Sequence, residues 1–320
     1  MKAAVATALL LLSTACASSL PLATLDADHA LNGRIWQPAT QSFITETAAQ
    51  ELLRAADYVL LGEKHDNSVH HRLQAEAVSD LVNAGRRPAL AFEMINSAQG
   101  EALQKHLGDK SKTADALGAA LDWRKSGWPD WRYYAPIATA ALKAGLKIVP
   151  ANFPRSKTRE IGRKGFVALD PDLVERAHLN DPLPETLAKS LMQEMFISHC
   201  RMMPTKHLGP VAKIQRARDA VMADALTRHD NAVLIAGSGH TRRDRGVPYY
   251  LRQMKSDARI VSVAFVEVDR ETMIPSDYAA IYNTDKLPFD LVRFTARYDT
   301  EDPCEKFKAQ LQKMKKKKSE

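Results

Sequence analysis

Short apolar runs alternate with amphipathic stretches along most of this chain. Four of the runs end directly on polar groups, at residues 58–61, 89–92, 148–151 and 233–236. Two longer apolar stretches follow them, at residues 259–268 and 289–295. Apolar runs of this length between helical patterns are typical of buried strands in a parallel sheet. The alternation therefore predicts an α/β fold, a three-layer sandwich around a mostly parallel central sheet.

The stretches between these runs predict the helices that cover the sheet. Leu73, Ala77 and Leu81 recur at helical spacing, and Gly85 follows the end of their segment. Turn-forming residues bound the other helical patterns. Helices are expected at residues 45–56, 67–84, 133–144 and 210–228, with two short ones between 98 and 121.

A segment without strands interrupts the alternation between residues 154 and 210. Four prolines divide it into helical pieces: Pro171, Pro182, Pro184 and Pro204. We therefore expect a helical lid inserted into the domain. Its strongest helical pattern, at residues 185–203, places Leu191, Met195, His199 and Met202 on one face.

The first residues have the pattern of an export signal. Lys2 precedes an apolar stretch at residues 3–12 that is too short to span a bilayer, and Ser13-Thr14-Ala15 precede Cys16. This layout predicts a lipoprotein signal peptide at residues 1–15 with Cys16 lipidated; the alternative is cleavage nearby with Cys16 incidental. The remaining divisions are expected to be a lead-in at 17–44, a single domain at 45–300 and a basic tail at 301–320.

Charge and cysteine content add two expectations. The net charge is +7, and much of the excess positive charge lies in Lys313 and Lys315–Lys318. This lysine run is expected to be a solvated tail, and the alternative is that it contacts anionic lipid. Export and the lack of a basic face with interleaved aromatics exclude nucleic acid as a partner. Export permits disulfides, and Cys200 and Cys304 either pair or remain buried thiols; we favour the disulfide.

Polar side chains follow the predicted strands at their carboxyl ends. Glu63 and His65 follow the first strand, and Glu93, Asn152 and His240 follow the next three. In open α/β sheets the ligand crevice lies at this edge. Such carboxylates and imidazoles can bind a divalent metal, act as acid and base, or bind polar groups of a ligand. The alternative is that they form ion pairs that tie loops together.

Two other groups of residues are candidates for ligand binding. Arg242, Arg243 and Arg245 follow a glycine-rich strand exit, which suits an anion, although the exit lacks the GxGxxG and GxSxG patterns of nucleotide-binding and serine hydrolase sites. Large apolar residues suited to a flat ligand or to a core form the second group: Trp123, Trp128, Trp131, Tyr133, Tyr134, Met195, Met202 and Met203.

A set of short motifs occurs in a characteristic order along the chain. The motifs are Leu61-Gly62-Glu63-Lys64-His65-Asp66-Asn67, Phe92-Glu93-Met94, Gly127-Trp128-Pro129-Asp130-Trp131, Asn152-Phe153-Pro154-Arg155, Ser198-His199-Cys200, Gly239-His240-Thr241-Arg242 and Gly246-Val247-Pro248-Tyr249-Tyr250-Leu251. Taken together, over roughly residues 40 to 270, they resemble the ChaN-like haem-binding lipoproteins.

The resemblance implies a protein of bacterial haem uptake that is anchored at the outer membrane and faces the periplasm. It also implies haem held between two protomers by an axial tyrosine, with a histidine near the propionates and an outer-membrane haem receptor or transport component as partner. Tyr134 is the favoured axial ligand here, with Tyr249, His178 and His199 as alternatives. The expected propionate contacts are Arg242, Arg243, Arg245 and His240.

Two functions follow from these residues. Haem binding is the leading hypothesis, because the chain supplies residue types suited to an apolar slot, an iron ligand and cations for the propionates. The alternative is a metal-dependent hydrolase in which a divalent metal and its water are held by Glu63, His65, Glu93 and His240. The chain lacks an HExxH pattern, which weighs against this alternative.

Overall fold

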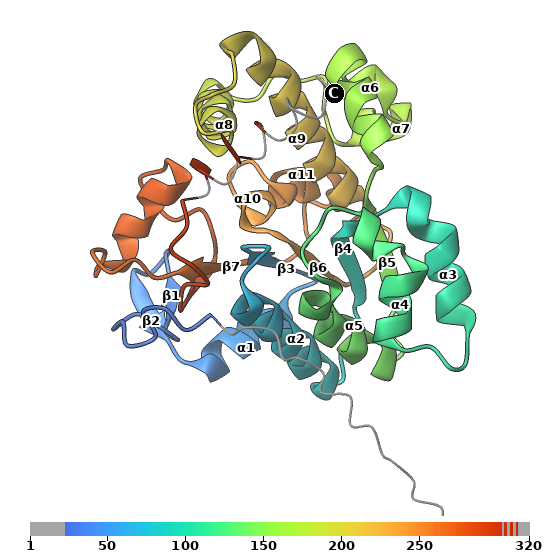
Figure 1. The fold of residues 1–320 in the computed structure, drawn as a ribbon, viewed down its shortest axis with the longest axis horizontal. Coiled ribbons are helices and arrows are strands. Elements are labelled where there is room, and N and C mark those ends of the chain that lie inside the picture. Colours follow the sequence, from blue (N-terminus) through green and yellow to red (C-terminus); the bar gives the residue numbers. More distant parts are fainter. Residues whose placement is uncertain (1–22, 303, 306–307, 310–311, 313–320) are drawn as a thin grey trace, which may run out of the picture.

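A computed structural model describes residues 23–302, 304–305, 308–309 and 312, and contains one eight-stranded sheet (Figure 1). The predicted signal peptide, Cys16 and the lysines from Lys313 onward lie outside these residues. The strands are β1 (Ile35–Gln37), β2 (Ser42–Ile44), β3 (Tyr58–Glu63), β4 (Ala89–Asn96), β5 (Ile148–Asn152), β6 (Ala232–Gly237), β7 (Ile260–Glu267) and β8 (Leu291–Thr295).

The sheet has the order β2-β1-β8-β7-β3-β6-β4-β5. All pairings from β8 to β5 are parallel, whereas β1 runs antiparallel to both β8 and β2. The predicted α/β fold with a mostly parallel sheet is therefore confirmed. Strand β3 lies between β6 and β7, so the loop that follows Glu63 leaves the middle of the sheet.

Alternate residues of the central strands point into two separate cores. Val59 and Leu61 pack in the core beneath α1 (Glu46–Ala55), α2 (Ser68–Asn83) and α5 (Trp131–Lys143). Tyr58 and Leu60 pack in the core beneath α9 (Thr205–Thr227) and α11 (Val247–Met254). This alternation requires apolar residues on both faces, which is why the strands read as unbroken apolar runs.

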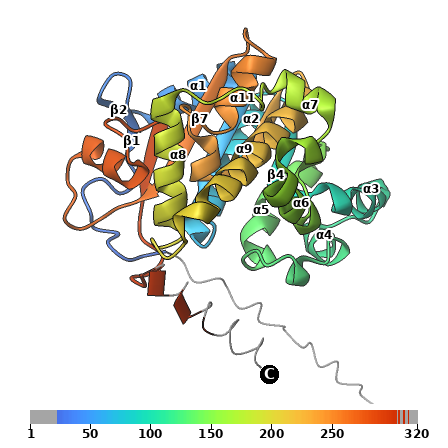
Figure 2. The same cartoon turned by 90° about the horizontal axis from the view of Figure 1, so that it is seen from above.

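Figures 1 and 2 show the remaining helices, which lie between the strands and the helices described above along the chain. The α-helices are α3 (Gly100–Gly108), α4 (Ala114–Ala120), α6 (Arg155–Lys164), α7 (Pro171–Arg176), α8 (Glu185–Ser198) and α10 (Ser238–Thr241). The 3₁₀ turns are η1 (Ser97–Gln99), η2 (Trp123–Lys125), η3 (Gly165–Ala168) and η4 (Pro275–Tyr282). The segment expected to be a helical insertion thus forms α6, η3, α7 and α8 and the start of α9. No helix among the described residues meets the length and hydropathy of a membrane span.

The boundaries of α8 and α9 differ from those predicted. Helix α8 ends at Ser198, because Cys200 and Arg201 both adopt a left-handed backbone with φ of 57°. Met202 and Met203 therefore lie beyond the helix, and the prediction that Met202 shares its apolar face is wrong. Helix α9 begins at Thr205 and carries Pro210 inside it.

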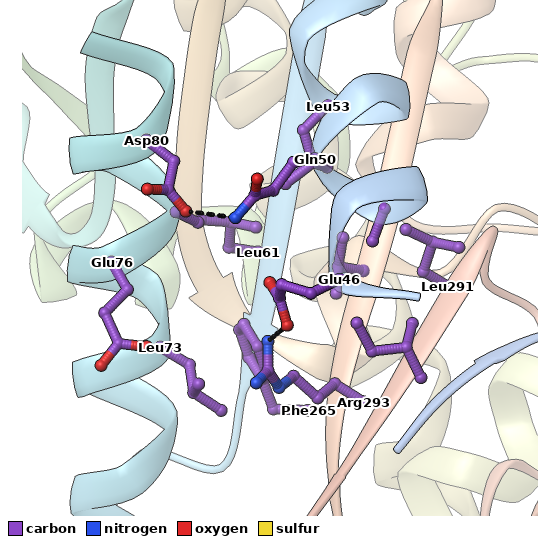
Figure 3. Close-up of a pocket in the computed structure, with 14 residues that line it drawn as sticks. Glu46, Gln50, Leu53, Leu61, Leu73, Glu76, Asp80, Phe265, Leu291 and Arg293 are labelled. Carbon is purple, nitrogen blue, oxygen red and sulfur yellow. Dashed lines mark hydrogen bonds and ion pairs between the residues drawn. The ribbon is translucent and has the colours of Figure 1, made fainter. Parts of the chain in front are cut away.

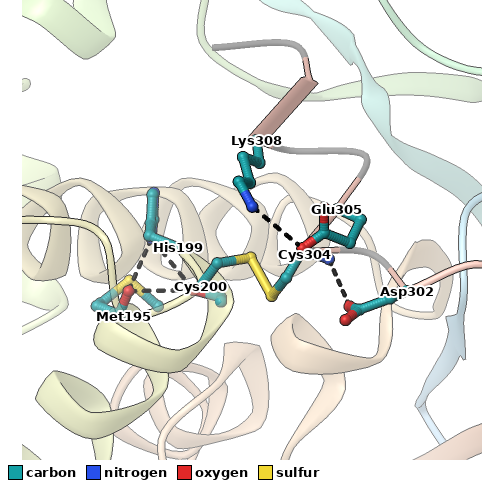
Figure 4. The surroundings of a disulfide bond; sticks show 8 residues. Met195, His199, Cys200, Asp302, Cys304, Glu305 and Lys308 are labelled. Carbon is teal, nitrogen blue, oxygen red and sulfur yellow. Dashed lines mark hydrogen bonds and ion pairs between the residues drawn. A yellow bond between two sulfur atoms is a disulfide. The ribbon is translucent and has the colours of Figure 1, made fainter. Parts of the chain in front are cut away.

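A disulfide joins Cys200, in the turn between α8 and α9, to Cys304 (Figure 4). Their Cα atoms are 5.3 Å apart across a sequence separation of 104 residues. A cross-link over so long a segment restricts the unfolded chain. The bond therefore fastens the tip of the α8–α9 hairpin to the C-terminal segment.

The antiparallel hairpin of β1 and β2 was not predicted from the sequence. Each strand has three residues, which is too short for an alternating pattern to be recognised. Trp36 and Phe43 pack edge to face across the hairpin, with ring centroids 4.9 Å apart. Part of the expected lead-in therefore belongs to the sheet.

Gly62, next to the end of β3, lies where the strand passes closest to α10. A Cβ atom there would lie 2.9 Å from Ser238 Cα and 3.0 Å from Val263 O, besides clashing with Thr241 Oγ1. Because backbone cannot yield easily, Gly62→Ala is expected to lower the free energy of unfolding by about 1–3 kcal/mol. Urea unfolding measures this effect.

Gly100→Ala serves as the matched control, because a Cβ at Gly100 meets no atom within 4 Å. This control is expected to leave stability unchanged or slightly raised. Equal stability of the two variants would contradict the close approach of β3 and α10.

Candidate functional site

The carboxylate of Glu63, at the end of β3, is buried among three side chains. Its Oε1 lies 2.8 Å from His65 Nδ1 and accepts a hydrogen bond from the Tyr134 hydroxyl at 3.2 Å. Its Oε2 lies 3.0 Å from Nδ1 of His71, on α2. Glu63 therefore links the loop after β3 to the two helices beneath the sheet.

Electrostatics keep this carboxylate ionised. Burial by itself raises the pKa of Glu63, but the charge of His71 and the hydrogen bond from His65 outweigh it and hold the pKa well below its usual range. Burial likewise lowers the pKa of His65, but the hydrogen bond to Glu63 and the charge of Glu93 outweigh it and raise that pKa. The Glu63 carboxylate is thus a fixed acceptor for His65 Nδ1–H.

A second buried group centres on His240, in α10. Its Nδ1 lies 2.6 Å from Asp219 Oδ1 on α9, and its Nε2 lies 3.3 Å from Glu93 Oε1 at the end of β4. Gln215 Nε2 approaches the same Nδ1 at 3.1 Å. Glu93 Oε2 accepts a hydrogen bond of 2.9 Å from the backbone N–H of Gly237. The imidazole of His240 is therefore bracketed by two carboxylates.

The two carboxylates act on His240 in the same direction. Burial opposes its charge, but Glu93 and Asp219 outweigh burial and raise the pKa of His240 to about 10. Burial opposes the charge of Glu93 too, but His240 lowers the pKa of Glu93 to about 2. Burial dominates at Asp219 and raises its pKa to about 6. At neutral pH His240 is a buried imidazolium.

His65 joins the two groups and is their most open member. Its Nε2 lies 4.0 Å from Glu93 Oε2, and its ring packs edge-on against Trp128 with centroids 4.9 Å apart. The His65 side chain is 33% exposed, whereas those of Glu63 and Glu93 are almost completely buried. We call the following residues the strand-end cluster: Glu63, His65, His71, Glu93, Tyr134, Asp219 and His240.

The structure thus brings Glu63, His65, Glu93 and His240 together at one edge of the sheet. Asn152, at the end of β5, lies beside them and donates a 3.0 Å hydrogen bond to the backbone oxygen of Glu93. Within the described residues, however, no group of three or more His, Cys, Asp or Glu side chains is arranged to hold a metal ion. Their polar atoms are instead directed at one another, so the alternative of a metal centre gains no support.

Tyr134, the favoured axial ligand, is fully buried on α5. Its hydroxyl donates to Glu63, and burial together with the nearby carboxylates raises its pKa well above the ordinary value. Its ring packs against Trp123 and His71, with centroid distances of 5.1 and 4.5 Å. The described geometry therefore leaves the Tyr134 oxygen closed to an incoming iron.

Most of the predicted aromatic group belongs to the core. The indole N–H of Trp123 donates to Pro129 O at 2.7 Å, and that of Trp131 donates to Ala114 O at 2.8 Å. Trp128 differs, because its ring meets His65 and lines a cavity. Trp128 is thus the aromatic residue of this group that packs on His65 and lines the cavity beside the strand-end cluster.

The arginines after β6 are engaged in ion pairs. Buried Arg242 and Arg245 both bind Glu194 of α8, and Arg242 also pairs with Asp244 at 2.7 Å. Arg243 pairs with Asp290 at 2.6 Å. The expectation that these arginines contact propionates is not matched by this geometry, because their guanidinium groups already have carboxylate partners. They fasten α8 to the segment after β6.

The alternative iron ligands lie outside the strand-end cluster. His199 directly follows α8 as its C-cap, with its Nδ1 2.7 Å from Met195 O, beside the disulfide (Figure 4). His178 follows α7 and pairs with Asp181 at 3.1 Å. Tyr249, on α11, packs edge-to-face on Tyr250 with ring centroids 5.2 Å apart. These three side chains therefore do not converge on one site.

A cavity of about 500 Å³ opens directly beside the cluster. Glu93, Trp128 and Asn152 line it together with apolar side chains and the cations Lys125, Arg155 and Arg218. Sequence reasoning missed these cations. Arg155 belongs to the motif Asn152-Phe153-Pro154-Arg155, which was used only for its place in the order of motifs. Arg218 directly precedes Asp219 on α9. A recognised contact between Asp219 and His240 would have pointed to Arg218.

A second cavity, of about 440 Å³, lies between α1, α2 and the sheet (Figure 3). Leu61, Leu73 and Phe265 contribute to its apolar lining. Its polar rim is internally paired, through Arg293 Nη1 to Glu46 Oε2 at 2.6 Å and Gln50 Nε2 to Asp80 Oδ2 at 3.0 Å. No member of the strand-end cluster lines it, so this cavity is separate from the candidate site.

The fold of the chain is similar to that of a solved protein structure. The chain is similar in structure to ChaN of Campylobacter jejuni, at 27% identity over 81% of this chain and 95% of that one, with a TM-score of 0.63. The effector HopBA1, at 15% identity, covers 83% and 98% of the two chains with a TM-score of 0.44. An erythromycin esterase EreC mutant, at 11%, covers 84% and 99% with a TM-score of 0.43. With TM-scores below 0.5, the last two similarities carry no argument about this chain.

A comparison of the whole chain with curated protein sequences found no match. A family model described as "Haem-binding uptake, Tiki superfamily, ChaN" matches residues 49–251, which include every member of the strand-end cluster and its cavity. This match spans more than half of the sequence and confirms the resemblance drawn from the ordered motifs. The chain belongs to the ChaN family of haem-binding uptake proteins.

Proposed function

We propose that this protein binds haem at the carboxyl edge of its sheet and serves haem uptake as an exported lipoprotein. The observation that carries this proposal is the family match over residues 49–251. The similar Campylobacter jejuni ChaN is described as binding haem cofacially, which supports haem held between two copies of the chain. The sequence pattern before Cys16 supports a lipid anchor at the outer membrane, where a haem receptor or transport component would be the partner.

His65 is the residue whose surroundings best fit an iron ligand. Histidines that bind a metal usually donate their second ring N–H to a carboxylate, which fixes the tautomer. His65 has this arrangement, because its Nδ1–H donates a hydrogen bond to the ionised Glu63 carboxylate, and Nε2 is the ring nitrogen that would bind iron in the neutral imidazole. Its side chain is also one-third exposed. Haem supplies the iron chemistry when bound; the protein supplies this oriented imidazole.

The surroundings of His65 suit a flat apolar molecule. Trp128 packs against the His65 ring and also lines the neighbouring cavity, together with Met94, Leu121 and Phe153. Ligand pockets of 300–1,000 Å³ with aromatic walls and few polar groups are common for cofactors. One cavity therefore has an apolar wall that includes the tryptophan packed against the His65 imidazole.

Haemin titration tests this function. Adding haemin to the mature protein is expected to produce a saturable shift of the Soret band. A spectrum that stays that of free haemin at all protein concentrations would contradict haem binding. Size-exclusion chromatography with and without haemin tests the pairing of two copies, which is expected to depend on haemin.

A further inference from the structure

The cavity beside Trp128 carries cations that the strand-end cluster does not use. Its wall is formed by the ends of β4 and β5, the loop at residues 126–128, the start of α6 and one side chain of α9. Arg155 and Arg218 come from α6 and α9, so two separate elements direct guanidinium groups toward the same space.

The loop before α5 shapes the position of Arg155. Gly127 has a φ of +85°, and a Cβ atom at this residue would clash with Arg155 Nη2. Arg155 Nη2 donates a 3.0 Å hydrogen bond to Ser126 O. The glycine therefore makes room for the guanidinium, which keeps further N–H donors in a planar fork.

Arg218 contains an unsatisfied donor. Its Nε is buried and has no hydrogen-bond partner among the described residues, and its guanidinium lies 6.0 Å from the centre of the Phe153 ring. A buried charged donor without a partner is costly, and a carboxylate is its natural complement. No ion pair of Arg218 is found among the described residues, so its positive charge stays available to an anion in the cavity that it lines.

The acidic groups that line the cavity already have partners. Glu93 binds His240 and the Gly237 N–H, and Asp122 pairs with Lys125 at 2.6 Å. What remains for a ligand is the positive charge of the arginines beside the apolar surfaces of Met94 and Phe153. The cavity therefore matches a flat, apolar dianion.

We propose that Arg155 and Arg218 bind the two carboxylates of haem in this cavity. The assignment rests on the haem-binding function proposed above and names the residues that receive the propionates. It replaces the arginines after β6, whose guanidinium groups are already paired with Glu194, Asp244 and Asp290.

The test compares three porphyrins on the wild type and on the Arg155→Gln, Arg218→Gln and double variants. Haemin carries both iron and carboxylates, haemin dimethyl ester lacks free carboxylates, and protoporphyrin IX lacks iron. Soret titration follows the two haemins, and quenching of tryptophan fluorescence follows protoporphyrin IX. Arg159→Gln, one turn further along α6 and outside the cavity lining, is the matched control. Circular dichroism and thermal unfolding confirm that each variant is folded.

Each single variant is expected to weaken haemin binding about tenfold. The substitution removes a charged hydrogen bond between the arginine and a propionate, and the loss of one such bond changes affinity by about this factor. The double variant should bind protoporphyrin IX more weakly by a similar or larger factor, while the dimethyl ester should bind wild type and double variant equally.

Unchanged haemin affinity in a folded double variant would overturn the assignment and leave haem binding intact. Absence of any Soret shift in the wild type, with quenching by protoporphyrin IX that depends on the arginines, would instead refute the haem function alone. Neither signal in the wild type would refute both.

Discussion

Glu63→Ala is expected to lower the free energy of unfolding by about 3–5 kcal/mol, the usual cost of removing one partner from a buried ion pair. The variant would leave His65, His71 and Tyr134 without the carboxylate that all three contact. The His71 imidazole would then be buried against the rings of Tyr133 and Tyr134 without its carboxylate partner. Urea unfolding at neutral pH, analysed with a common m-value, measures the loss.

Two further variants serve as controls for the stability loss of Glu63→Ala. Glu76→Ala removes a carboxylate of α2 that is 56% exposed and pairs with Arg72 at 3.6 Å, so its effect should stay within about 0.5 kcal/mol. Glu63→Gln keeps the shape of the side chain but removes its charge, and should fall between the two. Equal stability of Glu63→Ala and Glu76→Ala would show that the buried network around Glu63 does not form.

His65→Ala is expected to abolish the saturable Soret shift with haemin while changing stability by only about 1 kcal/mol. The side chain is one-third exposed and makes its main contacts at the surface of the cluster, with Glu63 and Trp128. Its loss therefore removes the nitrogen proposed to bind iron without opening the core. Parallel haemin titrations and thermal unfolding of wild type and variant measure both effects.

Controls for this second result come from the other candidate ligands. Tyr134→Phe removes the hydroxyl that donates to Glu63 and should retain the Soret shift, because this oxygen is buried. His178→Ala removes an imidazole that pairs with Asp181, away from the cluster, and should also retain it. A Soret shift that persists in His65→Ala and disappears in Tyr134→Phe would reassign the iron ligand to the tyrosine.

The strands and the edge that holds the site were predictable for one physical reason. Strands covered on both faces need apolar residues at every position, so β3, β4 and β6 stand out as uninterrupted runs. Because parallel strands end at the same edge, the polar residues that follow them converge without any knowledge of pairing. The positions of Glu63 and Glu93 follow from this rule.

The partners supplied by helices were not predictable in this way. His71 and Asp219 complete the strand-end cluster from α2 and α9, and neither stands at a strand end. Their roles depend on which face of each helix meets the sheet edge. The ion pairs of the arginines after β6 were not predictable for a related reason, because Glu194 lies 48 residues before Arg242 in the chain and becomes its partner only in the fold.

Soret titration of the wild type, His65→Ala and Tyr134→Phe with haemin tests the central claim, that haem binds at the strand-end cluster through His65. A saturable shift is expected in the wild type and in Tyr134→Phe, and no saturable shift in a folded His65→Ala. An unchanged shift in His65→Ala would show that His65 does not bind the iron.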